Sequence, residues 1–241
     1  MITVARENQS VVAVMSKDGD RVSGTAFFIQ SDRLLTCHHL LDPEHLKGRK
    51  VTLRGRDGIR FEAQFIPWES VPSSDLAVLA VEWKKCRRFR GRGLPLAKAI
   101  DQTDAIRYVG YTADDSPEQD CGVENEANFP AQIVTAGRLG EHTSIILSLP
   151  NREYWMQGFT LQDIAITPRQ SGGPIMDAET GAVVGFASAK SNPSACGSGT
   201  SIPNGTLSVV GVAIGPLATQ EGFRVLFDEN QASRAFYLRH L

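Results

Sequence analysis

The amino-acid sequence predicts an all-β fold, and two observations lead to that expectation. Short apolar segments dominate the 241 residues, while Gly, Pro, Asp and Asn interrupt them at close intervals. Apolar residues at helical spacing are scarce outside the C-terminal tail. Many short strands with turn signals between them are typical of β-sandwiches and β-barrels.

Two sets of segments are expected as strands. The first set is 10–15, 24–30, 33–37, 50–55, 60–66 and 76–83. The second set is 105–111, 130–139, 143–150, 159–166, 181–189 and 207–215. In the tail, residues 216–241, apolar residues recur at helical spacing and predict a short C-terminal helix.

Composition and charge argue against several classes of protein. With 41% hydrophobic residues, the chain can bury one sizeable core or two small cores in contact. Its formal net charge of −2 does not suit a polyanion-binding protein, and it lacks an apolar run long enough to span a membrane. Phosphate-loop, zinc-protease and dinucleotide motifs are missing, so no cofactor is expected.

The cysteines and the N-terminal residues bear on the cellular compartment. Cys37, Cys86, Cys121 and Cys196 form no CxxC pair, so no metal site is expected. The opening residues, MITVARENQS, lack the basic start and apolar stretch of a secretory signal. Reduced thiols in a cytoplasmic protein are therefore expected rather than disulfides.

Two charged stretches interrupt the strands. Residues 84–92 (KKCRRFRGR) lie between the two strand sets, and residues 114–126 (DDSPEQDCGVENE) form an acidic segment. Both are expected to be solvated connections, the first of them a linker; a docking or autoregulatory role is the alternative. Few aromatic residues interleave with the cations, so nucleic acid is not expected as a partner.

Ser171 stands in the segment ITPRQSGGPIM, directly before two glycines and a proline. A plain Ser-Gly-Gly turn explains the glycines but not a serine at the tip of an apolar segment. A nucleophilic serine needs a base, and the base needs a group that orients it. His39 follows one expected strand and Asp75 begins another, and both precede the serine in the chain.

Four motifs occur in an order that belongs to one family: GTAF at 24–27, TCHH at 36–39, DLAVL at 75–79 and QSGGP at 170–174. In these motifs the chain resembles the chymotrypsin-like serine proteases, most closely the bacterial Deg/HtrA protease domain without a PDZ domain. The similarity covers roughly residues 10–217. It implies two six-stranded antiparallel β-barrels with a short C-terminal helix. The first barrel is expected in residues 1–90 and the second in residues 91–241.

The resemblance implies a serine endopeptidase with a triad of His39, Asp75 and Ser171. The histidine would take the serine proton, while the carboxylate would fix the tautomer and stabilise the imidazolium. Backbone N–H groups of Arg169 and Ser171 would form the oxyanion hole. Ser188 matches the serine whose hydroxyl supports the triad carboxylate in this family.

For His39, Asp75 and Ser188 a second interpretation is open. His38 competes with His39, and the family spacing of three residues after Thr36 selects His39. Asp75 also fits a turn residue that starts a strand, and Ser188 also fits an ordinary strand residue.

Two departures from the family pattern bear on regulation. Arg169 occupies a position that is usually glycine, and a Cβ resists backbone angles that glycine adopts freely. An oxyanion hole that forms only when a ligand or an activating protein partner binds is therefore one hypothesis. Gln170 replaces the aspartate that pairs with a new N-terminus in secreted members, and Leu40 replaces the cysteine after their histidine. Activation by cleavage is therefore not expected, whereas an intracellular bacterial enzyme is.

Alignment with the family places the base of the substrate pocket near Ala165 and its walls at Ala189, Lys190 and Gly211. No carboxylate lies at the base, so specificity for Arg or Lys is not expected. A small or medium apolar side chain is the preferred prediction. An acidic side chain is the alternative, if the Lys190 ammonium points inward.

The sequence thus predicts a serine endopeptidase that acts on protein or peptide substrates. The alternative is a catalytically silent binding module that keeps the trypsin fold, and Arg169 is its main support. The intact set of histidine, aspartate and serine favours the enzyme.

Overall fold

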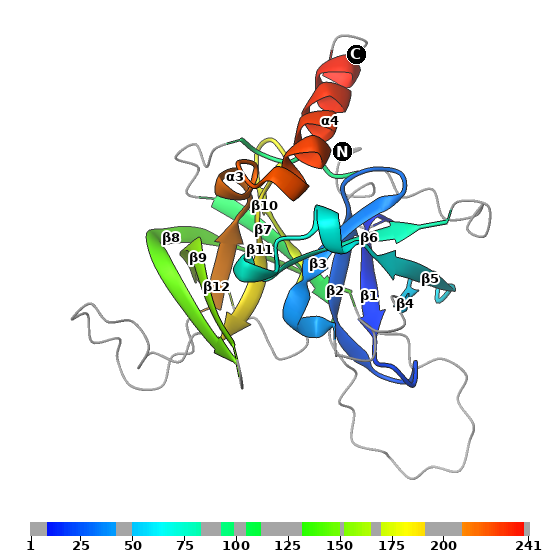
Figure 1. Ribbon diagram of the computed structural model, residues 1–241. Helices are drawn as coiled ribbons and strands as arrows, with labels where there is room; N and C mark the ends of the chain where they lie inside the picture. Colours follow the sequence, from blue (N-terminus) through cyan, green and yellow to red (C-terminus); the bar gives the residue numbers. More distant parts are fainter. Residues whose placement is uncertain are drawn as a thin grey trace.

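The computed structural model describes residues 9–41, 50–82, 93–98, 105–111, 132–149, 152–164, 170–190 and 209–238. These residues form two closed six-stranded antiparallel barrels that lie side by side, with a helix at the C-terminal end (Figure 1). The predicted fold class is therefore confirmed. The boundary predicted between residues 90 and 91 lies outside the described residues, as do both charged stretches, 84–92 and 114–126.

The two barrels repeat one strand topology. The first contains β1 (Val11–Met15), β2 (Val22–Phe28), β3 (Arg33–Cys37), β4 (Lys50–Arg54), β5 (Arg60–Phe65) and β6 (Leu76–Val81). The second contains β7 (Ala105–Tyr111), β8 (Gln132–Leu149), β9 (Arg152–Gln162), β10 (Pro174–Asp177), β11 (Val183–Lys190) and β12 (Val209–Ala213). Around the first barrel the order is β1-β2-β3-β6-β5-β4, and around the second it is β7-β8-β9-β12-β11-β10.

Short helical elements connect or follow the strands. In the first barrel they are the 3₁₀ turns η1 (His38–Leu40), η2 (Pro67–Glu69) and η3 (Pro72–Ser74). After the second barrel come α3 (Ile214–Leu217) and α4 (Glu221–Leu238). The predicted C-terminal helix is therefore confirmed. Among the described helices, none has the length and apolar character that a bilayer crossing requires.

The strand predictions differ from the structure in the second barrel. The expected strands 130–139 and 143–150 are parts of one strand, β8, because pairing with β9 resumes after a register shift that follows Leu139. β9 begins at Arg152, well before the expected 159, since its first residues pair with the end of β8. β10 is not among the predicted strands; it has four residues and starts at a proline, a position where proline costs no ladder bond.

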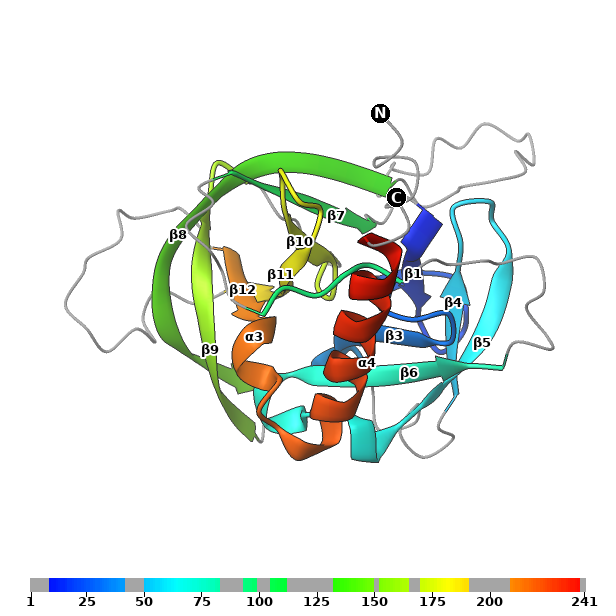
Figure 2. The same cartoon turned by 90° about the horizontal axis from the view of Figure 1, so that it is seen from above.

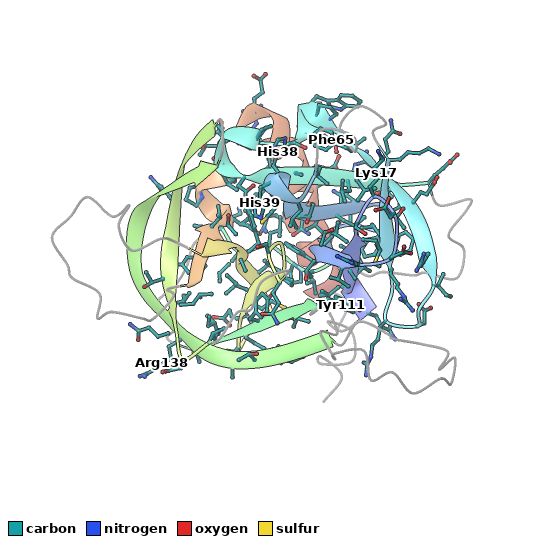
Figure 3. All side chains as sticks on the ribbon, turned by 90° about the horizontal axis from the view of Figure 1, so that it is seen from below. Lys17, His38, His39, Phe65, Tyr111 and Arg138 are labelled. Atoms are coloured by element: carbon teal, nitrogen blue, oxygen red, sulfur yellow. The ribbon has the colours of Figure 1, made fainter. Side chains whose placement is uncertain are left out.

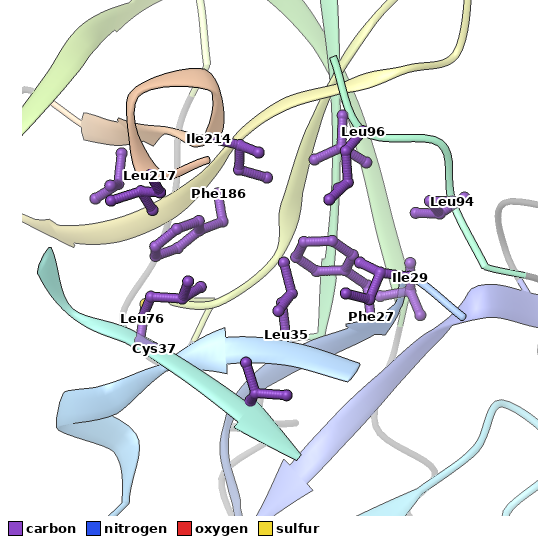
Figure 4. Close-up of a cluster of buried hydrophobic side chains, with 14 of the residues drawn as sticks. Phe27, Ile29, Leu35, Cys37, Leu76, Leu94, Leu96, Phe186, Ile214 and Leu217 are labelled. Carbon is purple, nitrogen blue, oxygen red and sulfur yellow. The ribbon is translucent and has the colours of Figure 1, made fainter. Parts of the chain in front are cut away.

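A single apolar cluster joins the two barrels. It includes Phe27 and Leu35 of the first barrel, Phe186 of the second, and Ile214 and Leu217 of α3, all of them buried (Figure 4). Each barrel also has a smaller cluster of its own. Because the largest cluster is shared, separating the barrels would expose apolar surface, which fixes their relative position.

Helix α4 packs over the segment that links the barrels, residues 93–98 (Figure 2). Its buried residues Phe223, Leu226, Phe227 and Asn230 recur at helical spacing and form one face. The Asn230 amide donates to the carbonyls of Ile29 (2.7 Å) and Leu94 (3.0 Å), and its oxygen accepts from the N–H of Leu96 (2.8 Å). This buried side chain therefore ties the linking segment to the first barrel.

Candidate active site

His39 is held by the turn that ends β3. The strand stops at Cys37, and η1 turns the chain so that His38 is buried while His39 stays partly exposed. The His38 ring packs edge-on against Phe65, with ring centroids 5.9 Å apart, whereas His39 points toward the region where the barrels meet (Figure 3). The structure therefore places the two adjacent histidines in different environments, and the role of His39 as the base stays a prediction.

Asp75 follows η3 in the left-handed backbone region, with φ of 58°. Aspartate is one of the few residues other than glycine that occupy this region with some frequency. The side chain is fully buried and faces the histidine turn. The His39 N–H donates to Oδ1 at 2.8 Å, and Nδ1 of the His39 ring lies 2.7 Å from Oδ2.

Ser188 reaches the same carboxylate from the other barrel. It lies on β11 and is buried, and its hydroxyl donates to Oδ2 of Asp75 at 2.6 Å. The carboxylate thus receives hydrogen bonds from both barrels. Loss of either barrel's alignment would leave a buried, partly unsatisfied charge, which is costly.

The electrostatics of the site favour an ionised Asp75. Burial by itself raises the pKa of this carboxyl, but hydrogen bonds and charge attraction from His39, together with the Ser188 hydroxyl, outweigh it and lower the pKa. Asp75 therefore stays negative at neutral pH, and its Oδ2 can accept a hydrogen bond from Nδ1–H of His39.

The serine loop is fixed by backbone hydrogen bonds on both sides of Ser171. The Thr25 N–H donates to the Ser171 carbonyl at 2.8 Å, and the Gly172 N–H donates to the Ala187 carbonyl at 2.6 Å. Gly172 has φ of 88°, and a Cβ there would lie 2.1 Å from the Thr25 carbonyl oxygen. Only glycine fits this conformation and this close approach.

The histidine turn and the serine loop meet at Gly24 on β2. A Cβ built at Gly24 would lie 2.3 Å from Cδ1 of Leu40 and 2.9 Å from the Ser171 carbonyl oxygen. Leu40 directly follows His39, so the chain segments that carry His39 and Ser171 both lie against the same glycine. Ser171 itself is partly exposed, as the predicted role of a nucleophile requires.

Cys37 lies beside the candidate triad but is fully buried. Its sulfur and ligand atoms of His39 and Asp75 lie within 4.8 Å of one another, a spacing that a metal site would also have. However, Sγ donates to the Ala187 carbonyl at 3.2 Å, and burial first, then the Asp75 charge, raises the pKa of the thiol well above its usual value. A protonated thiol is a poor metal ligand, and the hydrogen bonds already account for the geometry.

Several predicted residues fall outside what the structure describes. Ala165 and Arg169 lie in the undescribed segment 165–169, and the side chains of Ala189 and Lys190 are not described, although their backbone belongs to β11. Gly211 lies on β12, where its Cα faces the Phe159 ring in the barrel interior. The roles of these residues in the oxyanion hole and the substrate pocket stay predictions.

The sequence comparison identifies the family. The family model described as "Trypsin-like peptidase domain" matches residues 24–186, more than half of the chain. The chain belongs to this trypsin-like peptidase family. The trypsin-like domain is therefore a serine endopeptidase, and its substrates are proteins. Among curated proteins, none matches the sequence significantly.

Solved structures share the fold of this trypsin-like domain. The active form of the Rv3671c protease from M. tuberculosis matches with 23% identity and a TM-score of 0.62, over 90% of this chain and 82% of that chain. Deg5 matches with 16% identity and a TM-score of 0.56, over 90% and 89%. The HtrA-type protease AlgW, solved with a decapeptide, matches with 21% identity and a TM-score of 0.57, over 93% and 65%.

Sequence reasoning missed other residues that shape the trypsin-like site. Thr25 holds the Ser171 carbonyl, and Tyr108 of β7 donates from its hydroxyl to the Gln170 carbonyl. Thr25 lies in the GTAF motif, but that motif did not predict a contact with the serine loop, and Tyr108 lies outside the four motifs. Both contacts join segments far apart in the chain, so the sequence carries no local signal for them.

Proposed function

We propose that the chain hydrolyses peptide bonds of protein substrates through His39, Asp75 and Ser171. The observation that carries this proposal is the Asp75 carboxylate, which is buried, held ionised and bonded to both the ring and the backbone N–H of His39. A carboxylate bound in this way orients an imidazole so that its other nitrogen, Nε2, is free to accept a proton.

The chemistry follows from that orientation. The Ser171 hydroxyl attacks the carbonyl carbon of the peptide bond, and Nε2 of His39 removes its proton as the new C–O bond forms. The imidazolium is stabilised by Asp75 and then gives the proton to the leaving amine. The resulting ester on Ser171 is hydrolysed when Nε2 deprotonates a water molecule, which restores the free serine.

Stabilisation of the developing oxyanion is assigned to the backbone N–H groups of Ser171 and Arg169. Donors aimed at that oxygen act in a partly desolvated site and require no reorganisation during the reaction. The bulk of Arg169 at a position that is usually glycine supports a second element of the proposal. In this second part of the proposal, the oxyanion hole forms only when a substrate or an activating protein binds.

Structural neighbours make such regulation a reasonable expectation. The Rv3671c protease of M. tuberculosis has been solved in an inactive and an active form, so the same fold supports both states in that protein. For this chain, we place the switch at the peptide that joins Pro168 to Arg169, because that peptide carries the Arg169 N–H. The apolar substrate preference and the cytoplasmic location stay predictions from sequence alone.

Covalent labelling of Ser171 by a fluorophosphonate tests the proposed function. An activated serine displaces fluoride and becomes phosphonylated, whereas an ordinary serine does not react. We expect the native protein to take one label, and peptide mapping by mass spectrometry to locate it on Ser171. Heat-denatured protein and the Ser171→Ala variant serve as unlabelled controls.

Cell extract added during labelling separates the two forms of the proposal. Labelling that occurs only with extract supports activation by a partner, and labelling without it supports a preformed site. A native protein that remains unlabelled under both conditions contradicts the enzyme and favours the silent binding module.

A further inference from the structure

Tyr108 occupies the core of the second barrel, next to the residue that precedes the serine. It lies on β7 and is fully buried, and its hydroxyl donates to the carbonyl of Gln170. We infer that Tyr108 is a positioning residue, which aims the Ser171 N–H at the oxyanion by holding the Gln170 carbonyl. This inference rests on the proposed function and adds to it a residue outside the family motifs.

The geometry of the peptide bond connects the two groups. The Gln170 carbonyl and the Ser171 N–H belong to one planar trans peptide, so they point in opposite directions and rotate together. The Tyr108 hydroxyl holds the carbonyl toward the barrel interior. The N–H is therefore directed to the opposite side of the loop, away from Tyr108, and it has no hydrogen-bond partner among the described residues.

One backbone contact to the same carbonyl is weaker than that of the Tyr108 hydroxyl. The Gly173 N–H also approaches the Gln170 carbonyl, but at 3.4 Å, beyond the range of a good backbone hydrogen bond. The Ser171 carbonyl belongs to the next peptide, and the Thr25 N–H holds it at 2.8 Å. The two peptides around Ser171 thus have separate anchors, and only the first depends on a side chain.

The surrounding backbone leaves room for this tyrosine. A Cβ on Gly110 would lie 2.0 Å from the Tyr108 oxygen, and a Cβ on Gly173 would lie 2.6 Å from it. Any larger residue at either position would displace the hydroxyl from the Gln170 carbonyl. Two glycines, one on β7 and one in the serine loop, therefore enclose the donor.

The hydroxyl keeps its proton throughout the working range of pH. Burial raises the pKa of Tyr108 far above its ordinary value, so the group remains a donor. Its removal leaves the buried Gln170 carbonyl without this partner. A buried carbonyl that loses a hydrogen-bond donor is destabilised, which favours rotation of the peptide to bring the oxygen toward water and the Ser171 N–H inward.

The Tyr108→Phe variant tests the inference because it deletes one oxygen atom and keeps the ring. We expect the rate constant for fluorophosphonate labelling of Ser171 to fall by about 10- to 100-fold, somewhat less than deletion of an oxyanion donor costs. On a peptide substrate found by library profiling, kcat should fall by a similar factor while KM changes little. A peptide boronic acid should lose affinity in parallel with kcat/KM, because its tetrahedral adduct uses the same N–H.

Tyr111→Phe provides a matched control. Tyr111 is also buried on β7, and its hydroxyl donates to the Val11 carbonyl at 3.2 Å in the first barrel. This variant should lose stability but keep the wild-type labelling rate. Rates are compared well below the lower of the two Tm values, so that a loss of folded protein is not read as a loss of activation.

The pH dependence of labelling provides a further readout. Among the described residues, no hydrogen bond joins the Tyr108 hydroxyl to His39 or Asp75, so the midpoint of the labelling rate against pH should be the same in Tyr108→Phe and in wild type. A shifted midpoint would place the defect at the histidine and overturn the inference.

The remaining outcomes separate the role of Tyr108 from the proposed function. A folded Tyr108→Phe protein that labels as fast as wild type, or one whose KM rises while kcat is unchanged, overturns the role of Tyr108 and leaves the proposed function intact. Wild-type protein that is never labelled overturns both.

Discussion

Ser171→Ala is expected to lower kcat by about 10⁶-fold, the loss that removal of the nucleophile causes in a related triad. The substitution removes the attacking oxygen and nothing else of size, and Ser171 is partly exposed, so the fold should be preserved. The residual rate would come from the oxyanion donors and substrate binding alone. Turnover of a peptide substrate found by library profiling, measured for purified wild type and variant, provides the test.

Ser73→Ala is the appropriate control for that measurement. Ser73 is an exposed serine on η3, two residues before Asp75, and among the described residues no hydrogen bond joins its backbone to the serine loop. It should keep wild-type turnover. If Ser171→Ala retained substantial activity while Ser73→Ala behaved as wild type, another residue would have to be the nucleophile.

Asp75→Asn is expected to lower kcat by about 10⁴-fold at neutral pH. The asparagine amide would donate where the carboxylate accepts, so Nδ1 of His39 would become the acceptor and Nε2 would carry the proton. In that tautomer the ring cannot take the proton of Ser171. The position of the imidazole should change little, because the backbone N–H of His39 can still bond to the side-chain oxygen at position 75.

The same variant has a pH-dependent effect on stability. The pKa of Asp75 is lower in the folded protein than its usual value of about 3.9, so the ionised carboxylate contributes stability above that value. This contribution is lost as the pH falls through the folded-state pKa. The difference in free energy of unfolding between wild type and Asp75→Asn should therefore be largest near neutrality and shrink in acid.

Asp177→Asn controls for the loss of a buried carboxylate elsewhere. Asp177 on β10 accepts hydrogen bonds from the N–H groups of Glu179 and Thr180, and an asparagine oxygen can accept them as well. This variant should keep its turnover. Equal losses in the two aspartate variants would indicate that Asp75 acts only through stability.

Local patterns were sufficient to predict the fold class and the arrangement at the Asp75 carboxylate. Strand-length apolar segments predicted an all-β fold, and the resemblance to the family implied the two barrels. The family motifs selected His39 over its neighbour His38, which the structure buries against Phe65. The predicted support of Asp75 by Ser188 corresponds to a hydrogen bond of 2.6 Å. In each case a residue lies inside or beside a motif whose chemistry is recognisable.

The features that sequence reasoning missed depend on long-range packing. The joining of two expected strands into β8 depends on how β9 pairs across a bulge, and the sequence of β8 alone does not specify that pairing. The hydroxyl of Tyr108 meets the carbonyl of Gln170 across 62 residues of chain. Such a contact forms only when the barrel closes, so neither periodicity nor a local motif predicts it.

The crystal structure of the fluorophosphonate adduct would test most directly whether side chains from both barrels act as one catalytic unit. We predict phosphorus bonded to Oγ of Ser171, with Nε2 of His39 at a hydrogen-bonding distance of about 2.6–3.2 Å from an adduct oxygen. Asp75 should remain bonded to Nδ1, and the phosphonyl oxygen should accept from the Ser171 N–H. An adduct on Ser171 with the His39 ring turned away and out of reach, or an adduct on another residue, would contradict the account.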